Sequence, residues 1–266
     1  MEARGLVKSF VTERSLFGRV QRRFTAVHDV DFDLERGETL ALVGESGAGK
    51  STTGRLVLRL IEPDAGAVLF EGRDVLLLDK HDLRRARQHM QMIFQDPHSS
   101  LDPRIPIAEA VMEPLKVHFD LDHRERFRKM ATLLDRVGLG SNVFDRYPSE
   151  LSGGQLQRIA IARALTMEPK LIVCDEPVAA LDVSVRAQVL NLMHELQQER
   201  DIAYLFITHD LALVEVLADR VAVMKDGRIV ETGTPAQLYR SPTEEYTRAL
   251  VDAIPVPQPR SVRAAP

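Results

Sequence analysis

A glycine-rich loop at residues 44–51 (Gly-Glu-Ser-Gly-Ala-Gly-Lys-Ser) constrains the fold of this chain more than any other segment. It follows an apolar run at residues 39–43, which is typical of a buried strand, and it opens a helix-forming segment at residues 50–60. A strand, a tight turn and a helix start direct unpaired backbone N–H groups and the positive end of a helix dipole to one point. We therefore expect the loop to bind an anion.

The residue types in the loop predict which anion it binds. Glycines allow left-handed turns and a close approach of the backbone to phosphates. Lys50 can reach the β and γ oxygens of a nucleoside triphosphate, and Ser51 can offer its hydroxyl to Mg²⁺. The predicted nucleotide-binding residues here are Gly44, Glu45, Ser46, Gly47, Ala48, Gly49, Lys50, Ser51 and Thr52.

Length and composition agree with a nucleotide-binding enzyme. With 266 residues and 44% apolar content, the chain can bury a sizeable core as one large domain or two lobes. The net charge of −4 produces no field that would favour nucleic acid. The single cysteine, Cys174, excludes an internal disulfide framework and any cluster needing four thiolates of this chain. Without a signal-peptide core or a long apolar run, we expect the chain in the cytosol.

The patterning predicts an α/β fold. Strands are expected at 4–10, 24–34, 67–71, 171–175, 202–208 and 219–224, the last turning through Asp226-Gly227 into a hairpin arm at 228–231. From about residue 84 to 165 the pattern is helical, with helices expected at 107–118, 123–138 and 152–167. Strands that alternate with helices favour a mainly parallel sheet covered on both faces and interrupted by a helical insertion.

Polar residues follow several of the predicted strands, where a parallel sheet has its ligand crevice. Asp175 and Glu176 end an apolar strand, so that one can join a Mg²⁺ shell and the other can act as general base toward water. Gln95 follows an apolar stretch, and its neutral amide can ligate Mg²⁺ and the water. His209 ends another strand, from which its imidazole could donate to a γ-phosphate.

A second helix start suited to phosphate lies far along the chain. Ser152 is a good N-cap, and Gly153 and Gly154 would allow a phosphate to approach the N–H groups of the helix that follows. One chain with one strong nucleotide loop has no evident need for two such sites, unless two subunits face head to tail and complete each other. The sequence therefore predicts a dimer.

In these residues the chain resembles the ATP-binding cassette family over nearly its whole length. The motifs occur in the family's order: Walker A at 44–51, the glutamine loop at Gln95, the signature at 151–155, Walker B at 171–175 with Glu176 next, the D-loop at 180–182 and the switch histidine His209. The resemblance implies a P-loop NTPase (RecA-like) sheet core with an antiparallel β subdomain and an inserted α-helical signature subdomain. It divides a single domain, 1–266, into a core at 1–87 and 166–235, a helical subdomain at 88–165 and a C-terminal extension at 236–266.

The resemblance also implies roles for individual residues. ATP and Mg²⁺ would lie between the Walker A of one subunit and the signature of the other, with an aromatic side chain on adenine. Phe10 is the expected aromatic residue and Phe24 its rival. The metal ligands would be Ser51, Gln95 and Asp175, and catalysis would fall to Glu176, His209 and Gln95. Nucleotide binding would further use Ser152, Gly153, Gly154, Gln155 and Asp182.

Several segments resemble the ATPases of dipeptide, oligopeptide and nickel importers in particular. They are Gln-Asp-Pro at 95–97, Ser-Leu-Asp-Pro-Arg at 100–104, Glu-Pro-Leu at 113–115, and the C-terminal stretch that holds Tyr-Thr-Arg-Ala-Leu at 246–250. The chain departs from the subgroup at Glu244-Glu245, where a His-Pro pair is usual, and at Ala179, where the D-loop usually opens with Ser.

This subgroup implies an ATP-driven importer of di- or oligopeptides or a related small solute. Its partners would be two transmembrane permease subunits, a second ATPase subunit and, indirectly, a solute-binding protein, at the cytoplasmic face of the inner membrane. The permease would dock in a groove lined by residues just after Gln95, such as Asp96, Pro97 and Ser100. The alternative is the related ATPase-like subunit of a phosphonate carbon–phosphorus lyase complex.

Overall fold

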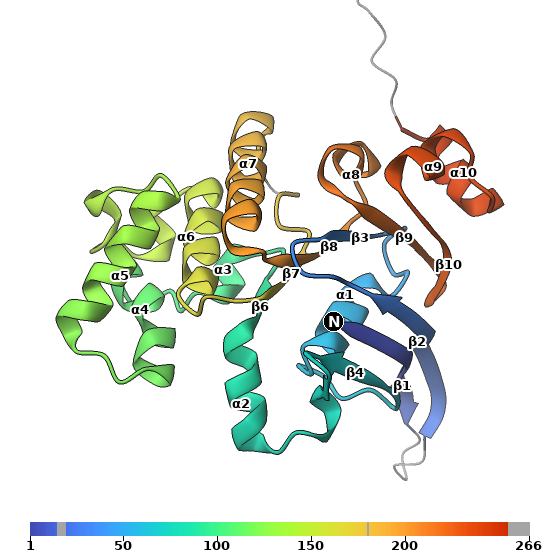
Figure 1. The fold of residues 1–266 in the computed structure, drawn as a ribbon, viewed down its shortest axis with the longest axis horizontal. Coiled ribbons are helices and arrows are strands. Elements are labelled where there is room, and N and C mark those ends of the chain that lie inside the picture. The colour runs from blue at the N-terminus through green and yellow to red at the C-terminus, as the bar shows by residue number, and fades with distance from the viewer. Residues whose placement is uncertain (15–19, 180, 255–266) are drawn as a thin grey trace, which may run out of the picture.

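A six-stranded sheet lies at the centre of the molecule, which we describe for residues 1–14, 20–179 and 181–254 of a computed structural model (Figure 1). Its strand order is β10-β9-β3-β8-β7-β6, and all neighbours are parallel except β10 and β9. Every residue of β3, β7 and β8 is buried, which explains why their sequences are mostly apolar. The strands are β3 (Thr39–Val43), β6 (Met90–Ile93), β7 (Leu171–Asp175), β8 (Ala203–Thr208), β9 (Arg220–Lys225) and β10 (Arg228–Gly233).

A second, antiparallel sheet covers one face of the first with a helix between them (Figure 1). Helix α1 (Lys50–Val57) contacts both sheets, and one apolar cluster joins Leu6 and Val30 of the antiparallel sheet to Leu56 of the helix and Leu205 of the central sheet. The strands, in the order β2-β1-β4-β5, are β1 (Glu2–Arg14), β2 (Val20–Asp33), β4 (Ala65–Phe70) and β5 (Arg73–Asp74).

The opposite face of the central sheet is covered by helices from later in the chain. Residues of β3 alternate between the faces: Leu40 and Leu42 belong to the cluster around α1, whereas Ala41 and Val43 pack with Val214 of α8. The helices concerned are α7 (Val183–Arg200), α8 (Leu211–Leu217), α9 (Pro235–Arg240) and α10 (Glu245–Asp252).

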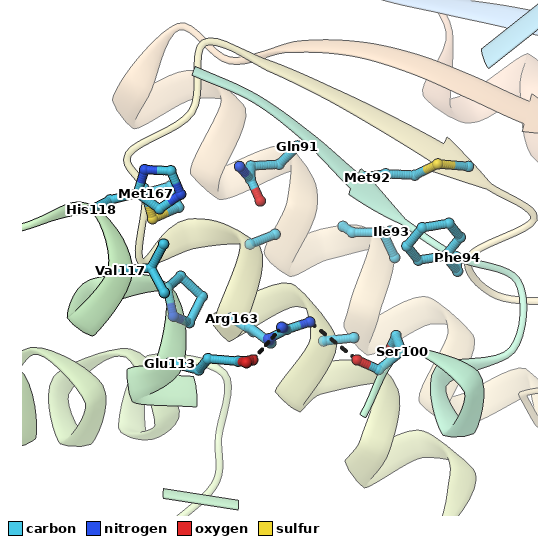
Figure 2. A pocket seen from close by; sticks show the side chains of 13 residues that line it. Gln91, Met92, Ile93, Phe94, Ser100, Glu113, Val117, His118, Arg163 and Met167 are labelled. Carbon is cyan, nitrogen blue, oxygen red and sulfur yellow. Dashed lines mark hydrogen bonds and ion pairs between the residues drawn. The ribbon is translucent and has the colours of Figure 1, made fainter. Parts of the chain in front are cut away.

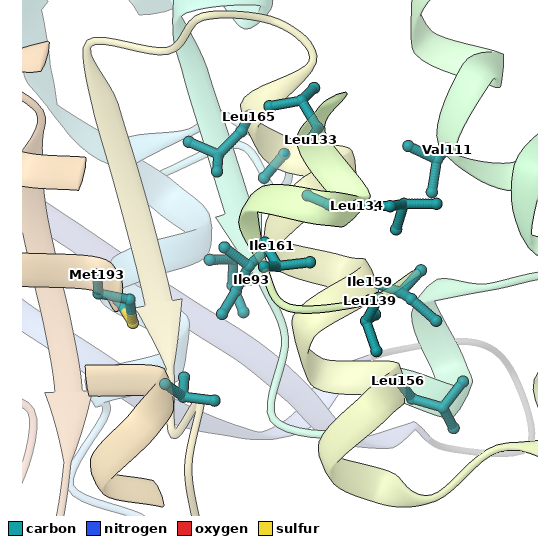
Figure 3. Close-up of a cluster of buried hydrophobic side chains, with 14 of the residues drawn as sticks. Ile93, Val111, Leu133, Leu134, Leu139, Leu156, Ile159, Ile161, Leu165 and Met193 are labelled. Carbon is teal, nitrogen blue, oxygen red and sulfur yellow. The ribbon is translucent and has the colours of Figure 1, made fainter. Parts of the chain in front are cut away.

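A group of helices extends from the β6 edge of the sheet (Figure 1). Figure 3 shows their apolar core, in which Val111, Leu134 and Ile159 come from three different helices. The same cluster continues to Cys174 and Phe206 of the central sheet, so the helices are joined to it by packing as well as by the chain. The helices are α3 (Pro97–Ser100), α4 (Ile107–His118), α5 (His123–Arg136) and α6 (Gly153–Leu165), with short 3₁₀ turns at Ser141–Val143 and Pro148–Glu150. Helix α2 (Lys80–His89) and the 3₁₀ turn at Val75–Leu77 pack instead against the cluster around α1.

These elements confirm the α/β prediction and correct it at one place. The helical pattern expected from about residue 84 is wrong at Met90–Ile93, where β6 pairs with β7 in the central sheet. Four residues are too few to show a period, and methionine and glutamine are good helix formers, so the strand had no signal of its own. The expected subdomain boundary at residue 88 therefore lies before a strand of the core. Ala180 of the D-loop and the prolines after residue 254 lie outside the described residues.

Gly54 allows α1 to lie close to the sheet, so we expect Gly54→Val to be destabilising. A Cβ at this position would be 2.8 Å from Ile207 Cδ1 and 2.8 Å from Val173 Cγ1, both on buried strands. The overpacked helix should lower the free energy of unfolding by about 1–3 kcal/mol in urea denaturation. The control is Gly153→Ala, whose Cβ would meet nothing within 4 Å. Equal unfolding midpoints for both variants would contradict this account of the packing.

Candidate nucleotide-binding site

The glycine-rich loop joins β3 to α1 and lies against the backbone of two other strands. Gly44 and Gly49 have φ angles of 151° and 101°. A Cβ at Gly44 would be 2.1 Å from the carbonyl oxygen of Met224, and a Cβ at Gly49 would be 2.2 Å from that of Ala26. No other residue type fits at these two positions, so the glycines fix the loop against β9 and β2.

Lys50 begins α1 and turns its ammonium back into the loop. Its Nζ donates to the carbonyl oxygens of Gly44 at 2.7 Å and Glu45 at 2.8 Å, and the residue is only 5% exposed. Burial lowers the pKa of this ammonium, while the negative charges of Glu176, Asp175 and Glu45 oppose the change. The loop uses two of its three N–H donors.

Ser51 and Asp175 place two oxygen atoms together at the bottom of the site. The Ser51 hydroxyl donates to Asp175 Oδ1 at 2.7 Å, joining the first turn of α1 to the end of β7. Burial raises the pKa of Asp175, and the hydrogen bond from Ser51 and the charge of Arg55 oppose it. A hydroxyl oxygen and a carboxylate oxygen are ligands that suit Mg²⁺.

Glu176 is the meeting point of three strand ends. Its Oε1 lies 2.9 Å from Nδ1 of His209, which follows β8, and its Oε2 accepts from Nε2 of Gln95, which follows β6, at 3.0 Å. The backbone of Glu176 is left-handed, with φ of 47°, and its N–H donates to Ile207. The structure thus brings together the three residues that the sequence placed at separate strand ends.

A cleft of about 700 Å³ opens over these groups. Phe10 and Phe24 are direct cross-strand partners in β1 and β2, and both line the cleft, so the choice of the adenine-stacking residue stays a prediction. Most of the other residues predicted to bind nucleotide also line it: those at 44–47 and 49–52, together with Gln95, Glu176 and His209. Ala48 lies beneath the loop in an apolar cluster.

Three lining residues were missed by sequence reasoning. Ala26 and Leu211 stand two residues after Phe24 and two residues after His209, so their neighbourhood could have indicated them. Leu250 belongs to α10 at the far end of the sequence, and no local signal places it here.

The signature residues lie outside this cleft. Ser152 and Gln155 form a capping box at the start of α6, in which Gln155 N donates to Ser152 Oγ at 3.3 Å and Ser152 N donates to Gln155 Oε1 at 3.0 Å. Ser152 and Gly153 are exposed, and the partly buried Gly154 packs beside α7. Asp182 caps α7 by accepting from Val185 N at 2.9 Å. The chain therefore presents a second helix start that does not face its own nucleotide loop.

A groove of about 270 Å³ lies between β6 and the helices, beyond Gln95 (Figure 2). Arg163 of α6 lies in it, donating to the carbonyl oxygen of Ser100 at 3.1 Å and to Glu113 at 2.8 Å. Of the residues expected to line a groove here, Ser100 does, whereas Asp96 and Pro97 are not among the lining residues. Apolar side chains of Met92, Phe94, Val117 and Met167 form much of the remainder.

The family model for ABC transporters matches residues 27–179, more than half of the chain. The chain belongs to the ABC transporter family. This match includes the nucleotide loop, Gln95, the signature and the carboxylate pair. Along the part of the chain that is described, none of the helices has the length and apolar character needed to cross a membrane.

Relatives and solved structures agree with the family. The chain is 50% identical to the glutathione import ATP-binding protein GsiA of Escherichia coli O157:H7 over 99% of its own length, and 50% identical to GsiA of Salmonella typhimurium over 97%. It spans 42% of the length of each relative. The dimeric ATP-binding cassette MJ0796 bound to ADP and Pi aligns with a TM-score of 0.78 and 26% identity over 88% of this chain and 98% of that one. The cassette cbiO1 from Clostridium perfringens aligns with a TM-score of 0.75 and 28% identity over 90% of each chain.

Proposed function

We propose that this chain is the ATP-hydrolysing subunit of an importer for small peptides or a related solute, working as a dimer on membrane permease subunits. The observation that carries the proposal is the convergence of Lys50, Glu176, Gln95 and His209 on one cleft beside the glycine-rich loop, with Asp175 bonded to Ser51 directly beneath it. The relatives' name, glutathione import ATP-binding protein, supports the peptide class because glutathione is a small peptide. Nothing favours the alternative of a phosphonate-lyase subunit.

ATP binding is assigned to the loop and to the aromatic pair. The N–H groups at the start of α1 and the Lys50 ammonium meet the phosphates, and Phe10 or Phe24 covers the adenine. These groups come from two strands and one helix, and the close approaches at Gly44 and Gly49 hold the loop against β9 and β2. The site is thus formed before its ligand arrives, which limits the entropy lost on binding.

The donor set also fits a magnesium ion. Ser51 and Asp175 supply a hydroxyl and a carboxylate that already lie within 2.7 Å of each other, and Gln95 supplies an amide nearby. These hard oxygen donors would hold Mg²⁺, which would neutralise charge on the transferred phosphoryl group.

Hydrolysis is assigned to Glu176, whose carboxylate can accept a proton from an attacking water. His209 and Gln95 hold the two oxygens of this carboxylate from opposite sides, so its orientation is fixed. His209 can donate to a γ-phosphate, because its side chain is 60% exposed at the cleft.

The first test of this assignment is Glu176→Gln, which removes the base but keeps its shape and hydrogen-bonding capacity. We expect ATP binding to persist and steady-state phosphate release to fall on the order of 10²-fold or more, equivalent to about 3 to 5 kcal/mol of transition-state stabilisation. Lys50→Ala is the contrasting variant, because it should weaken binding of a fluorescent ATP analogue at equilibrium. Phosphate release near the wild-type rate in Glu176→Gln would refute the role of the carboxylate.

Dimerisation is proposed from the two helix starts. Gly154 has a structural reason to lack a side chain, since a Cβ would lie 2.7 Å from Val185 Cγ1. Gly153 has none, because its Cβ would meet nothing within 4 Å. We assign the open space at Gly153 to the γ-phosphate of a nucleotide held by the partner's loop. The dimeric cassette structure with the same fold supports this arrangement.

The second test places a carboxylate in that space. In a Glu176→Gln background, Gly153→Asp should leave the ATP affinity of the monomer unchanged, because nothing in the subunit is displaced. It should prevent ATP-driven dimerisation in size-exclusion chromatography, since like charges at 4 Å repel by roughly 4 kcal/mol at an effective dielectric of 20. A control, Gly153→Asn, adds the same bulk without the charge. Undiminished dimerisation of the Asp variant would mean that this helix start is only an ordinary capped end.

We assign the groove beneath Gln95 to a helix of the permease, at the cytoplasmic face of the membrane. Most of its lining residues are apolar, and two of the polar ones, Ser100 and Glu113, are already paired by Arg163, which suits an amphipathic helix (Figure 2). It adjoins the segment that carries Gln95, so a helix seated here would contact the elements that hold the catalytic carboxylate.

Val117→Asp tests this assignment. Val117 is 48% exposed in the groove, and a buried unpaired carboxylate would oppose docking. We expect the variant to hydrolyse ATP like wild type in isolation but to lose co-purification with co-expressed permease subunits. Val216→Asp provides the matched control, because Val216 is 89% exposed on α8 and is not among the groove residues. Equal recovery of both variants with the permease would place the docking site elsewhere.

A further inference from the structure

The C-terminal helix α10 reaches the nucleotide loop, although it is more than 190 residues away in the sequence. The hydroxyl oxygen of Tyr246 accepts a hydrogen bond from the backbone N–H of Glu45 at 3.1 Å. Leu250, one helical turn later on the same face, lines the nucleotide cleft. The Tyr-Thr-Arg-Ala-Leu segment that stands out in the sequence therefore has a specific contact, which the assigned ATPase roles do not use.

The contact leads directly to Lys50. The peptide unit that joins Gly44 to Glu45 is held at both of its polar atoms: the Glu45 N–H donates to Tyr246 at 3.1 Å, and the Gly44 carbonyl oxygen accepts from the Lys50 ammonium at 2.7 Å. Because a peptide unit is planar and rigid, fixing the N–H side of this loop segment also restricts the neighbouring carbonyl group that positions the ammonium. Tyr246 thus limits the movement of the Lys50 ammonium, the group proposed to bind the phosphates.

The aromatic ring of Tyr246 is itself held in place. Lys225, at the end of β9, lies over the ring with Nζ 4.8 Å from its centroid, and the side chain packs in the apolar cluster under α8 and α9. Burial raises the pKa of the phenol, so the hydroxyl stays neutral at pH 7.

The start of α10 is anchored to the edge of the central sheet. Glu231 of β10 accepts hydrogen bonds from Thr243 N at 2.8 Å, from the Thr243 hydroxyl at 2.8 Å and from Glu244 N at 3.1 Å. This anchor takes the place of a side-chain cap, which Glu244 does not provide. Sheet edge, helix and loop are therefore joined in one continuous set of contacts.

We infer that α10 braces the nucleotide loop, and that Tyr246 is a positioning residue which raises affinity for nucleotide by holding the Gly44–Glu45 peptide unit. The inference rests on the proposed function, since it concerns the same nucleotide site. It assigns the C-terminal segment to nucleotide affinity, separate from catalysis and from the partner's phosphate.

Tyr246→Phe tests the inference because it removes the hydroxyl and keeps the ring. We expect the dissociation constants of the isolated chain for ATP and ADP to rise about 2- to 10-fold, the range for one lost hydrogen bond. The hydrolysis rate at saturating ATP should stay within about twofold of wild type, because no catalytic group moves. The thermal unfolding midpoint should hardly change, because this hydrogen bond is exposed and the freed Glu45 N–H can bond to water instead.

Tyr204→Phe is the matched control. Tyr204 also makes one hydrogen bond to the backbone, donating to the Met193 carbonyl oxygen at 3.2 Å, but it is buried at the opposite end of β8 from His209. It should lower the unfolding midpoint and leave nucleotide affinity unchanged, the reverse of the pattern for Tyr246→Phe. An unchanged dissociation constant in Tyr246→Phe, or a change matched by Tyr204→Phe, would overturn the inference.

A double-mutant cycle with Glu231→Ala tests the brace as a unit. Releasing the start of α10 should weaken nucleotide binding in the same direction as Tyr246→Phe, and the double variant should be no weaker than the worse single variant. Fully additive losses would show that the anchor and the hydroxyl act separately. A wild-type chain that binds no nucleotide would instead contradict the proposed function, so the two failures can be told apart.

Discussion

Burying the ammonium of Lys50 takes a positive charge out of water, and the surrounding fold is arranged around that cost. Two carbonyl oxygens of its own loop accept from it, and the carboxylates of Asp175 and Glu176, at the C-terminal end of β7, place negative charge near it. Those carbonyls point inward only because the loop is pressed against β9 and β2, which glycine permits at two positions. The same loop geometry directs the N–H groups at the start of α1 outward. The loop conformation that buries the Lys50 ammonium is thus also the one that forms the proposed phosphate site.

The two glycines at the start of α6 have different reasons to lack a side chain: one is required by packing within the subunit and the other is not. A side chain at Gly154 would strike Val185, so monomer stability alone accounts for that glycine. Gly153 is exposed and unobstructed, and a helix start would be more stable with alanine there. A residue that costs stability without a structural reason in its own subunit is best explained by a contact outside it, and an anion is what a bare helix start binds.

Much of this architecture could be predicted from local sequence, because its signals are local. Strand β7 and helix α4 occupy the predicted residues, and Gln95, Glu176 and His209 meet because parallel strands end at one edge. Strand β6 could not be predicted, since pairing with β7 outweighs the helix propensity of four residues. The contact of Tyr246 with Glu45 could not be predicted either. It depends on how α10 packs on the sheet, and a local sequence pattern does not show which distant residues come into contact.

The contacts around Arg163 explain how the groove and the cleft can respond to each other under the proposed function. Arg163 lies on the helix that begins at Gly153, and it holds the carbonyl oxygen of Ser100 at the end of α3. Helix α3 follows Gln95, whose amide holds Glu176. A partner seated in the groove would therefore press on a unit that contains both the partner-facing helix start and one of the two groups orienting the general base. Because α6 packs as a rigid helix in a continuous apolar core, movement at Arg163 is carried to Gly153 with little loss. Closure of the dimer and alignment of the carboxylate are then two consequences of one displacement.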